Sequence, residues 1–364
     1  MSRQPLQREE LRAWLGLTLV PGVPRLAQCA LLRAFGSPQG VVGTKREHLA
    51  QVAGPDVAER IARGPDARLV EHTLAWLDAP GRHFITLGTP EYPPLLAEAG
   101  LDAPLVLYAE GRAELLNVPT VAIVGSRNAT RQGIEDAERF GRELSEAGFA
   151  IVSGLALGID AAAHRGGLAG ASSSLAMMGT GPDILYPRRN AALARELAAR
   201  GCLVSEFPLH TAPMPGNFPR RNRLISGIAQ GVLVVEAAVE SGSLITAEYA
   251  GRQGREVLAM PGSIHSPLSK GCHSLIRDGA ALVESVDDVL RALKVAPAPP
   301  RPEIRMENHD VVLQALGYSP ATLDELAMRT QLGAATLAAR LTRLELEGSV
   351  DSLPGGRFQR AGRH

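Results

Sequence analysis

With 364 residues, the chain is too long for one ordinary domain and should form two or three. Its 38 basic and 38 acidic side chains cancel, which excludes long-range attraction of a polyanion, so any nucleic-acid site must be local. The composition, 45% apolar with no long apolar segment and no apolar leader, predicts no membrane segment, and we expect a cytoplasmic protein.

The first 80 residues are predicted to form a helical domain. Apolar residues recur at helical spacing from Leu11 to Leu19 and from Leu26 to Phe35, on either side of the loop sequence PGVP at 21–24. This connection is typical of helix-hairpin-helix and SAM-like modules, which often contact DNA backbones, although packing alone is the simpler interpretation. Residues 81–117 are expected to connect this domain to the next.

Residues 118–293 alternate apolar runs with amphipathic segments, the pattern of βαβ units on a parallel sheet. The runs are continuous, as expected for strands covered by helices on both faces. The fold class is therefore α/β, with an extended Rossmann-like, doubly wound parallel sheet. The predicted strands are 121–124, 150–152, 175–178, 202–204, 232–235 and 257–260.

The last part of the chain is predicted to be a separate winged helix. A proline-rich linker, 294–306, precedes it, and residues 307–364 show three helical patterns followed by a hairpin at Gly355-Gly356. Between 310 and 360 there are five arginines and six acids, which does not favour duplex DNA. We expect a protein-contact or accessory role, with duplex-DNA regulation as an alternative.

Glycine-containing loops follow most of the predicted strands. In an open parallel sheet, ligands bind beyond the carboxyl ends of the strands, and amides at glycine turns that open helices bind anions. The loops begin at Gly125, Ser153, Gly179, Ser241 and Pro261. These loops predict a phosphate-bearing ligand. The GxGxxG and Walker A motifs are absent, so we expect no cofactor. For each single loop, a turn that the fold needs remains the alternative.

The stretch GNFPRRNRLISG, residues 216–227, places three arginines beside Phe218. A guanidinium group binds phosphate through a planar fork, and a phenylalanine ring can stack on a base. Residues 187–225 contain seven arginines against Glu196 and Glu206, a local excess of five positive charges that suits a single strand. The alternative is a solvated helix face whose arginines pair with acids.

The sequence predicts neither a catalytic set nor a metal site. Asp160 and His164 are four residues apart and would share a helix face, but with no third ligand evident we expect helix capping and packing instead. The three cysteines form no metal-ligand pattern, and a GxSxG elbow is absent. Glu236 ends the fifth predicted strand; we expect it to anchor Arg221 or Arg223 rather than to act as a base.

Seven motifs occur together in a specific order: VAIVGSRNAT, SGLALGIDAAAH, MGTGPDILYP, SEFP, FPRRNRLISG, VVEAAVESGSLITA and REVLAMPG. In this respect the chain resembles the DNA-processing protein A family, DprA or Smf. The resemblance implies a non-catalytic protein that binds single-stranded DNA, takes it over from single-strand-binding protein and loads RecA recombinase in natural transformation. The alternative is an enzyme resembling nucleotide phosphoribohydrolases, although their PGGxGTxxE motif is absent.

The resemblance also assigns residues to the predicted interfaces. The implied single-strand contacts are Gly125, Ser126, Arg127, Ser153, Gly154, Arg188, Phe218, Arg220, Arg221, Asn222, Arg223, Ser241 and Gly242. A homodimer is implied as well, through a surface around His273, Ile276 and Leu282, where His273 stands at a position that is asparagine in many members.

Overall fold

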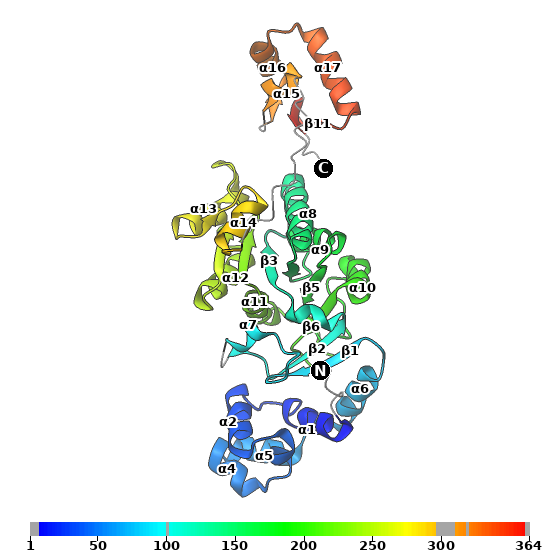
Figure 1. Cartoon of the computed structure of the whole chain (residues 1–364), viewed down its shortest axis with the longest axis vertical. Helices are drawn as coiled ribbons and strands as arrows, with labels where there is room; N and C mark the ends of the chain where they lie inside the picture. The colour runs from blue at the N-terminus through cyan, green and yellow to red at the C-terminus, as the bar shows by residue number, and fades with distance from the viewer. Residues whose placement is uncertain (1–6, 100–101, 296–309, 318–319, 361–364) are drawn as a thin grey trace. The chain divides into compact units, whose positions relative to one another are not determined.

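The computed structural model describes residues 7–99, 102–295, 310–317 and 320–360, and it divides the chain into two compact units, 1–296 and 297–364 (Figure 1). Most of the predicted linker lies outside the described residues. Within those residues, no helix combines the length and apolar character that a membrane crossing requires.

Helices open the first unit and pack around their own apolar core, which includes Leu17, Leu31 and Leu49. The turns between them follow from local sequence: α2 ends at Gly36, whose φ of 75° is in the left-handed region that favours glycine, and a proline opens α3. The helices are α1 Arg8–Thr18, α2 Arg25–Phe35, α3 Pro38–Val42, α4 Arg46–Ala53, α5 Pro55–Arg63 and α6 Ala67–Leu77.

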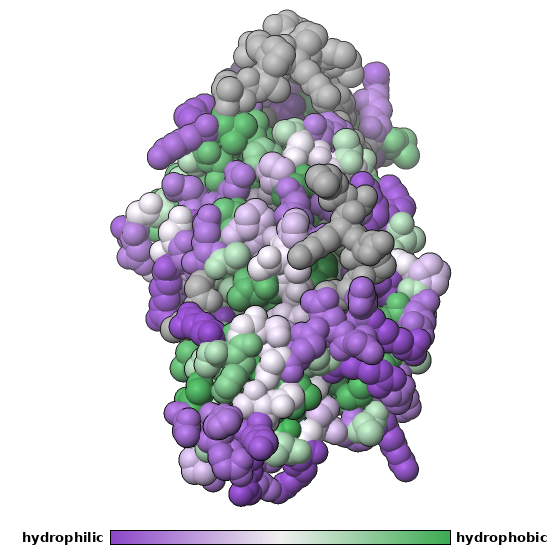
Figure 2. Space-filling view, turned by 60° about the horizontal axis from the view of Figure 1, so that its bottom comes forward, coloured by the Kyte–Doolittle hydropathy of each residue, from purple (hydrophilic) through white to green (hydrophobic). Residues whose placement is uncertain are grey.

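Seen from this helical end, the molecular surface mixes hydrophilic side chains with smaller apolar areas (Figure 2). Three large apolar side chains of these helices, Leu26, Val42 and Val52, are exposed. Scattered apolar residues of this kind are normal on a protein surface and do not by themselves mark an interface.

The described strands of the first unit form a nine-stranded sheet with the order β1-β2-β6-β5-β4-β3-β7-β8-β9. Strands β3 to β8 coincide with the six predicted runs and are parallel, which confirms the doubly wound sheet. The segment 81–117, expected to be a connection, adds β1 and β2 as antiparallel strands. The strands are β1 Arg82–Thr86, β2 Val106–Gly111, β3 Thr120–Val124, β4 Ala150–Ser153, β5 Ser174–Met177, β6 Cys202–Ser205, β7 Gly231–Val234, β8 Glu256–Ala259 and β9 Ala281–Leu282.

Helices cover both faces of the parallel strands, and alternate side chains of each strand therefore pack in different cores. In β3, Ala122 and Val124 pack in a core with α11 and α12, whereas Val121 and Ile123 pack with α8 and α9. The helical elements are α7 Pro94–Ala97, η2 Ala113–Asn117, α8 Arg131–Glu146, α9 Ile159–Ala169, η3 Arg188–Asn190, α10 Ala191–Arg200, α11 Asn217–Ile228, α12 Gly242–Arg252, η4 Pro267–Ser269, α13 Lys270–Arg277 and α14 Val286–Ala292.

The strand order reverses between β3 and β7. From β3 the chain proceeds outward through β4, β5 and β6, and it then returns to β7 on the other side of β3. At such a switch point the loops at the carboxyl ends of neighbouring strands separate to opposite faces and leave a crevice, which is where ligands bind in sheets of this class.

The second unit has its own core and confirms the predicted winged helix. Leu313, Leu326 and Leu341, one from each helix, are buried together, and the strands form a three-stranded sheet in the order β10-β12-β11. The hairpin turns at Gly355 and Gly356, both with positive φ. The elements are α15 Val311–Leu316, β10 Ala321–Thr322, α16 Leu323–Thr330, α17 Ala334–Leu346, β11 Val350–Leu353 and β12 Arg357–Arg360.

Candidate nucleic-acid interface

A cavity of about 710 Å³ opens at the switch point of the sheet. Three segments far apart in sequence line most of it: the loop 125–128 after β3, the first turns of α11 and the first turns of α12. Of the predicted contact residues, this cavity brings together Gly125, Ser126, Arg127, Phe218, Arg221, Asn222, Ser241 and Gly242. The glycine loop and the basic turn therefore meet at one edge of the sheet.

Arg127 and Phe218 form the centre of this contact. The Arg127 side chain is exposed, and its guanidinium carbon lies 6.0 Å from the centroid of the Phe218 ring, within the range of a cation–π contact. Phe218 reaches this place over Gly179, where an added Cβ would lie 2.7 Å from Cδ1 of the ring. Glycine at 179 therefore leaves the space that the aromatic ring occupies.

Tyr186 also lines the cavity, although the sequence did not predict it as a contact residue. Its ring centroid lies 5.5 Å from that of Phe218 with the planes tilted by 38°, and 45% of the residue remains exposed. The two rings thus provide flat surfaces for stacking beside the positive charge of the Arg127 guanidinium. The available signal was the position of Tyr186 in MGTGPDILYP, just after a strand-end glycine loop in a chain with few aromatic residues.

Arg221 was expected to bind phosphate directly; it lines the cavity, but the protein itself occupies several of its donors. Arg221 is only 4% exposed, and its Nη1 donates to the carbonyl oxygens of Gly154, at 2.6 Å, and of Met177. Burial lowers the pKa of Arg221 to about 10, and the charge of Asp160 acts against this lowering. Arg221 therefore remains cationic at neutral pH, but both acceptors of its Nη1 belong to the protein.

Asp160 and His164 hold the loop after β4 by accepting hydrogen bonds from its backbone amides. The Asp160 carboxylate accepts hydrogen bonds from the amides of Gly154 and Ala156, at 3.1 and 3.3 Å, rather than capping α9. The His164 Nε2 accepts from the amide of Leu155, and burial lowers the pKa of His164 to about 3. A neutral buried histidine and a buried carboxylate in these roles are structural supports.

Arg220 and Arg223 both lie beside the carboxylate of Glu206, in line with the alternative interpretation that arginines of this helix pair with acids. The carboxylate of Glu206 is buried; it pairs with Arg223 Nη2 and lies 3.3 Å from Arg220 Nε. Arg223 also donates to the carbonyl of Asp102 and is mostly buried, whereas the Arg220 side chain is 57% exposed and lies over Phe207. Glu206 is already subtracted in the local charge balance, so this pairing leaves the net excess unchanged but engages Arg223 and, in part, Arg220 with the protein.

Ser153 and Gly154, also predicted to contact the strand, are both buried, and neither lines the cavity. The Ser153 hydroxyl donates to the carbonyl of Ile123 at 2.6 Å, a bond between neighbouring strands. Gly154 contacts the Arg221 guanidinium so closely that an added Cβ would lie 2.7 Å from it. Arg188 is exposed in η3 and lies outside the residues that line the cavity.

The remaining predicted contacts connect α11 to α12 at the floor of the cavity. Asn222 Nδ2 donates to the carbonyl of Gly242 at 3.2 Å, and Asn222 Oδ1 accepts from Arg221. The hydroxyl of Ser241 caps α12 by accepting from the amide of Ser243. The hydroxyl of Ser126 accepts a hydrogen bond from the amide of Asn128, so a side chain within the loop after β3 fixes the conformation of that loop.

Two glutamates near the cavity have roles that the sequence did not reveal. Glu236 accepts from the amide and hydroxyl of Thr130, at 2.9 and 2.6 Å, and so holds the start of α8; the expectation that it anchors Arg221 or Arg223 is wrong. Glu240 is exposed and adds a negative charge to the cavity lining that also includes Arg127.

The residues assigned to a dimer surface lie on α13 and β9. Leu282 is 48% exposed at the edge strand of the sheet, and Ile276 is partly buried against the core. The His273 ring lies 3.0 Å from the carbonyl of Gly262, which ties α13 to the preceding loop.

Comparison with known proteins gives two matching family models and several similar chains. Residues 83–294 match the model described as DNA recombination-mediator protein A, and residues 296–356 match the DprA winged helix domain. The chain is 40% identical over 306 residues to Protein Smf of Escherichia coli (strain K12), across 80% of this chain and 82% of that protein. It is 46% identical over 189 residues to the DNA processing protein DprA of Streptococcus pneumoniae (strain ATCC BAA-255 / R6), across 52% and 67%.

Two solved structures show the same likeness. The X-ray structure of DNA processing protein A from Streptococcus pneumoniae superposes with a TM-score of 0.68 at 34% identity, covering 79% of this chain and 98% of that one. DNA processing protein A from Helicobacter pylori, whose structure is described for its single-stranded DNA binding mode, gives a TM-score of 0.53 at 29% identity, covering 58% and 95%.

Proposed function

The chain belongs to the family of DNA recombination-mediator protein A, also called DprA or Smf, and from this premise we propose that it binds single-stranded DNA in the cavity at the switch point of its sheet. The observation that carries the proposal is the meeting of Arg127 with Phe218 and Tyr186. An exposed guanidinium beside two aromatic rings suits a strand whose phosphates and base faces are both accessible, and base faces are accessible only when bases are unpaired. The single-stranded DNA binding mode described for the Helicobacter pylori relative supports it further.

In this proposal Arg127 binds a phosphate through its fork, while the rings of Phe218 and Tyr186 stack on one base. The start of α12 faces the same cavity and adds the positive end of a helix dipole. None of these contacts reads a base edge, so binding is independent of sequence. Arg221 contributes indirectly by holding the loop after β4 in place.

The test is fluorescence anisotropy with labelled oligothymidine and with a labelled duplex, each across a sodium chloride series. We expect the single strand to bind more tightly than the duplex, with an affinity that falls as salt rises because phosphate contacts release counterions. Equal affinity for both DNAs, or an affinity for the single strand that salt does not change, contradicts the proposal.

We further propose that the protein is a binding protein and not an enzyme. The carboxyl groups of Asp160 and Glu236 are held by backbone amides or by Thr130, which supports structural roles for both. Incubation with nucleoside monophosphates should release no free base. Measurable turnover that is lost on substitution of Asp160 or Glu236 would instead favour the phosphoribohydrolase alternative.

The family membership supports a finer proposal about the pathway: the bound strand is taken over from single-strand-binding protein and passed to RecA recombinase, during natural transformation and in the cytoplasm. RecA filament assembly on oligothymidine coated with single-strand-binding protein tests this step. We expect the protein to shorten the delay before assembly. An unchanged delay at saturating protein contradicts the finer proposal but leaves the DNA-binding proposal intact.

We also propose a homodimer through the surface around His273, Ile276 and Leu282. The exposed position of Leu282 on the edge strand supports it. Sedimentation of the full chain should show a dimer that Leu282→Glu weakens, whereas the same change at the exposed Leu26 should not. A wild-type chain that sediments as a monomer at high concentration contradicts this proposal.

A further inference from the structure

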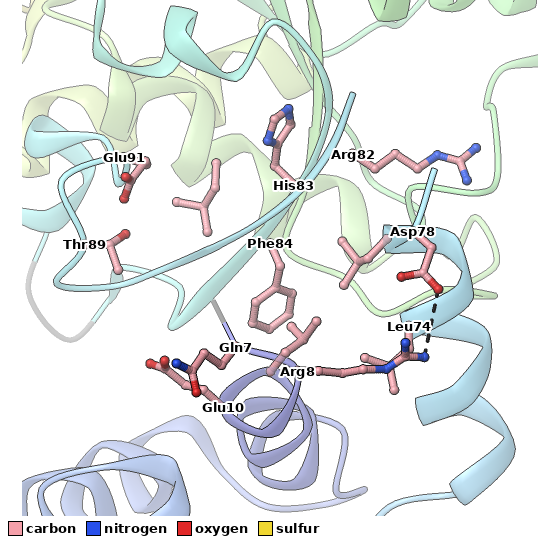
Figure 3. A pocket seen from close by; sticks show the side chains of 13 residues that line it. Gln7, Arg8, Glu10, Leu74, Asp78, Arg82, His83, Phe84, Thr89 and Glu91 are labelled. Atoms are coloured by element: carbon pink, nitrogen blue, oxygen red, sulfur yellow. Dashed lines mark ion pairs between the residues drawn. The ribbon is translucent and has the colours of Figure 1, made fainter. Parts of the chain in front are cut away.

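A second cavity, of about 810 Å³, lies along β1 and shares no lining residue with the DNA cavity (Figure 3). Strand β1, the first turn of α1, the end of α6 and the loop 89–91 surround it. We call it the β1 groove. Its location matters because β1 is the edge strand of the sheet, at the opposite end of the strand order from β9.

The backbone of β1 has amide and carbonyl groups along this groove that are not paired with another described strand. Among the described strands, β1 pairs only with β2, in antiparallel register. Leu87 donates its amide to the carbonyl of Leu105, which fixes the phase of the ladder. Because hydrogen-bonded pairs alternate along an antiparallel ladder, the amide and carbonyl groups of Arg82 and Phe84 point away from β2. An added extended chain would satisfy these groups.

The floor of the groove is apolar. Phe84 points from β1 toward α1 (Figure 3), and its ring is half-buried together with Leu11 and Leu77 over the buried side chain of Leu74. In an added strand, every second side chain would face this floor. The groove therefore fits an extended segment with apolar side chains at alternate positions.

The two ends of the groove differ in charge. At one end Arg8 lies 4.0 Å from Asp78, and Arg82 is paired with Glu110 and lies over Trp76, so these charges are compensated. At the other end lie Glu10 and Glu91, as Figure 3 shows, and neither forms an ion pair with a described residue. That end is complementary to a cation and repels phosphate.

We propose that the β1 groove binds an extended peptide segment of a partner protein, which adds to β1 as a further strand. The segment carries apolar side chains at alternate positions along the floor that includes Phe84 and a lysine or arginine at the end that faces Glu10 and Glu91. Backbone hydrogen bonds supply much of the affinity in this recognition mode, and the pockets for alternate side chains supply specificity. The proposal does not depend on DNA binding at the other cavity.

The first test uses a fluorescein-labelled peptide, KLTVTL, and the full chain in an anisotropy titration. Two further peptides carry N-methyl groups on alternate residues, one set on each edge of the extended chain. Methylation of the edge that faces β1 should lower the affinity about ten-fold through loss of amide donors, and methylation of the opposite edge should not. Absence of saturable binding, or equal effects of both methylation patterns, overturns the proposal.

The second test changes the acidic end and has a matched control on the same helix turn. Glu10 lines the groove whereas its neighbour Glu9 does not, and both stand in the first turn of α1. Glu10→Lys should weaken KLTVTL binding about five-fold, Glu9→Lys should leave it within about two-fold, and Glu10→Lys should come to prefer the peptide ELTVTL. Thermal melting by circular dichroism checks that both variants fold alike. Equal binding by the two variants overturns the charge assignment and with it the proposal.

If the edge of β1 instead pairs with a second copy of this chain, sedimentation will show a dimer that the peptide does not dissociate and Glu10→Lys does. That outcome also overturns the proposal, because it assigns the groove to self-association.

Discussion

The DNA cavity has two layers whose charged residues are used differently. In the exposed layer, Arg127 stands beside Phe218 and Tyr186 with its guanidinium directed to the cavity. In the buried layer, Arg221 donates to two protein carbonyls and to the side chain of Asn222, and its charge interacts with that of Asp160. The same residue type therefore serves binding in one layer and support in the other. Substitutions should separate the two: those in the buried layer should change stability, and those in the exposed layer should change DNA affinity alone.

The largest effect is expected for Arg221→Met. It removes two hydrogen bonds to backbone carbonyls and a buried cation whose charge favours the ionised form of Asp160, and we expect this loss to cost about 3–5 kcal/mol. Urea unfolding measures the loss. The exposed Arg195 on α10, changed to methionine, is the control and should cost less than about 1 kcal/mol. Similar losses for both variants would show that Arg221 is not the support that its contacts indicate.

The buried layer should also make stability depend on pH. The folded pKa of His164 is lowered to about 3, so between pH 6.5 and pH 3 the unfolded chain binds a proton that the folded chain does not. Stability contributed by the neutral histidine is therefore lost as pH falls, by roughly 1.4 kcal/mol per unit once well below the unfolded pKa. Comparing urea unfolding of wild type and His164→Gln from pH 7 to pH 5 isolates this slope. A wild-type slope equal to that of the variant contradicts the assignment.

In the exposed layer, Tyr186→Ala should weaken oligothymidine binding by about 1–2 kcal/mol through loss of stacking, without changing the salt dependence. Tyr186→Phe keeps the ring and should bind as wild type does. Urea unfolding should give the same midpoint for all three proteins. A loss of affinity in Tyr186→Phe as large as in Tyr186→Ala would place the effect on the hydroxyl group and not on the ring.

The smallest effect is expected for Glu240→Gln, which removes an exposed negative charge from the lining of the cavity. Affinity for oligothymidine should rise by about two-fold at low salt, and the gain should vanish at high salt because exposed charges are screened. Glu248→Gln, on the outer face of α12, should change nothing. A gain that persists at high salt would mean that the substitution alters the shape of the cavity.

The arrangement of the sheet and the loops could be predicted because each rests on a local signal. Continuous apolar runs mark β3 to β8, and the strand-end rule places Arg127 and the Phe218 turn at one edge. The antiparallel pairing of β1 and β2 with the main sheet escaped prediction because the sequence RHFIT of β1 alternates only weakly and because β6, the partner of β2, lies far along the chain.

Which arginine is free could not be predicted, since that depends on acids brought in by other segments. Glu206 comes from the loop after β6, and Asp160 comes from α9. A count of charges in one stretch of sequence treats Arg220, Arg221 and Arg223 alike, although folding leaves only the first substantially exposed. Arg127, on a short loop after a strand, escapes this pairing among the described residues.

The central claim is that Arg127 contacts the DNA backbone, and the salt dependence of oligothymidine binding by Arg127→Ala tests it most directly. The affinity should fall about ten-fold, the slope of log affinity against log salt should decrease by about 0.7, and urea unfolding should be unchanged. Arg291→Ala, which removes an exposed arginine on α14, should keep the wild-type slope. A slope that is the same in wild type and Arg127→Ala would contradict the account.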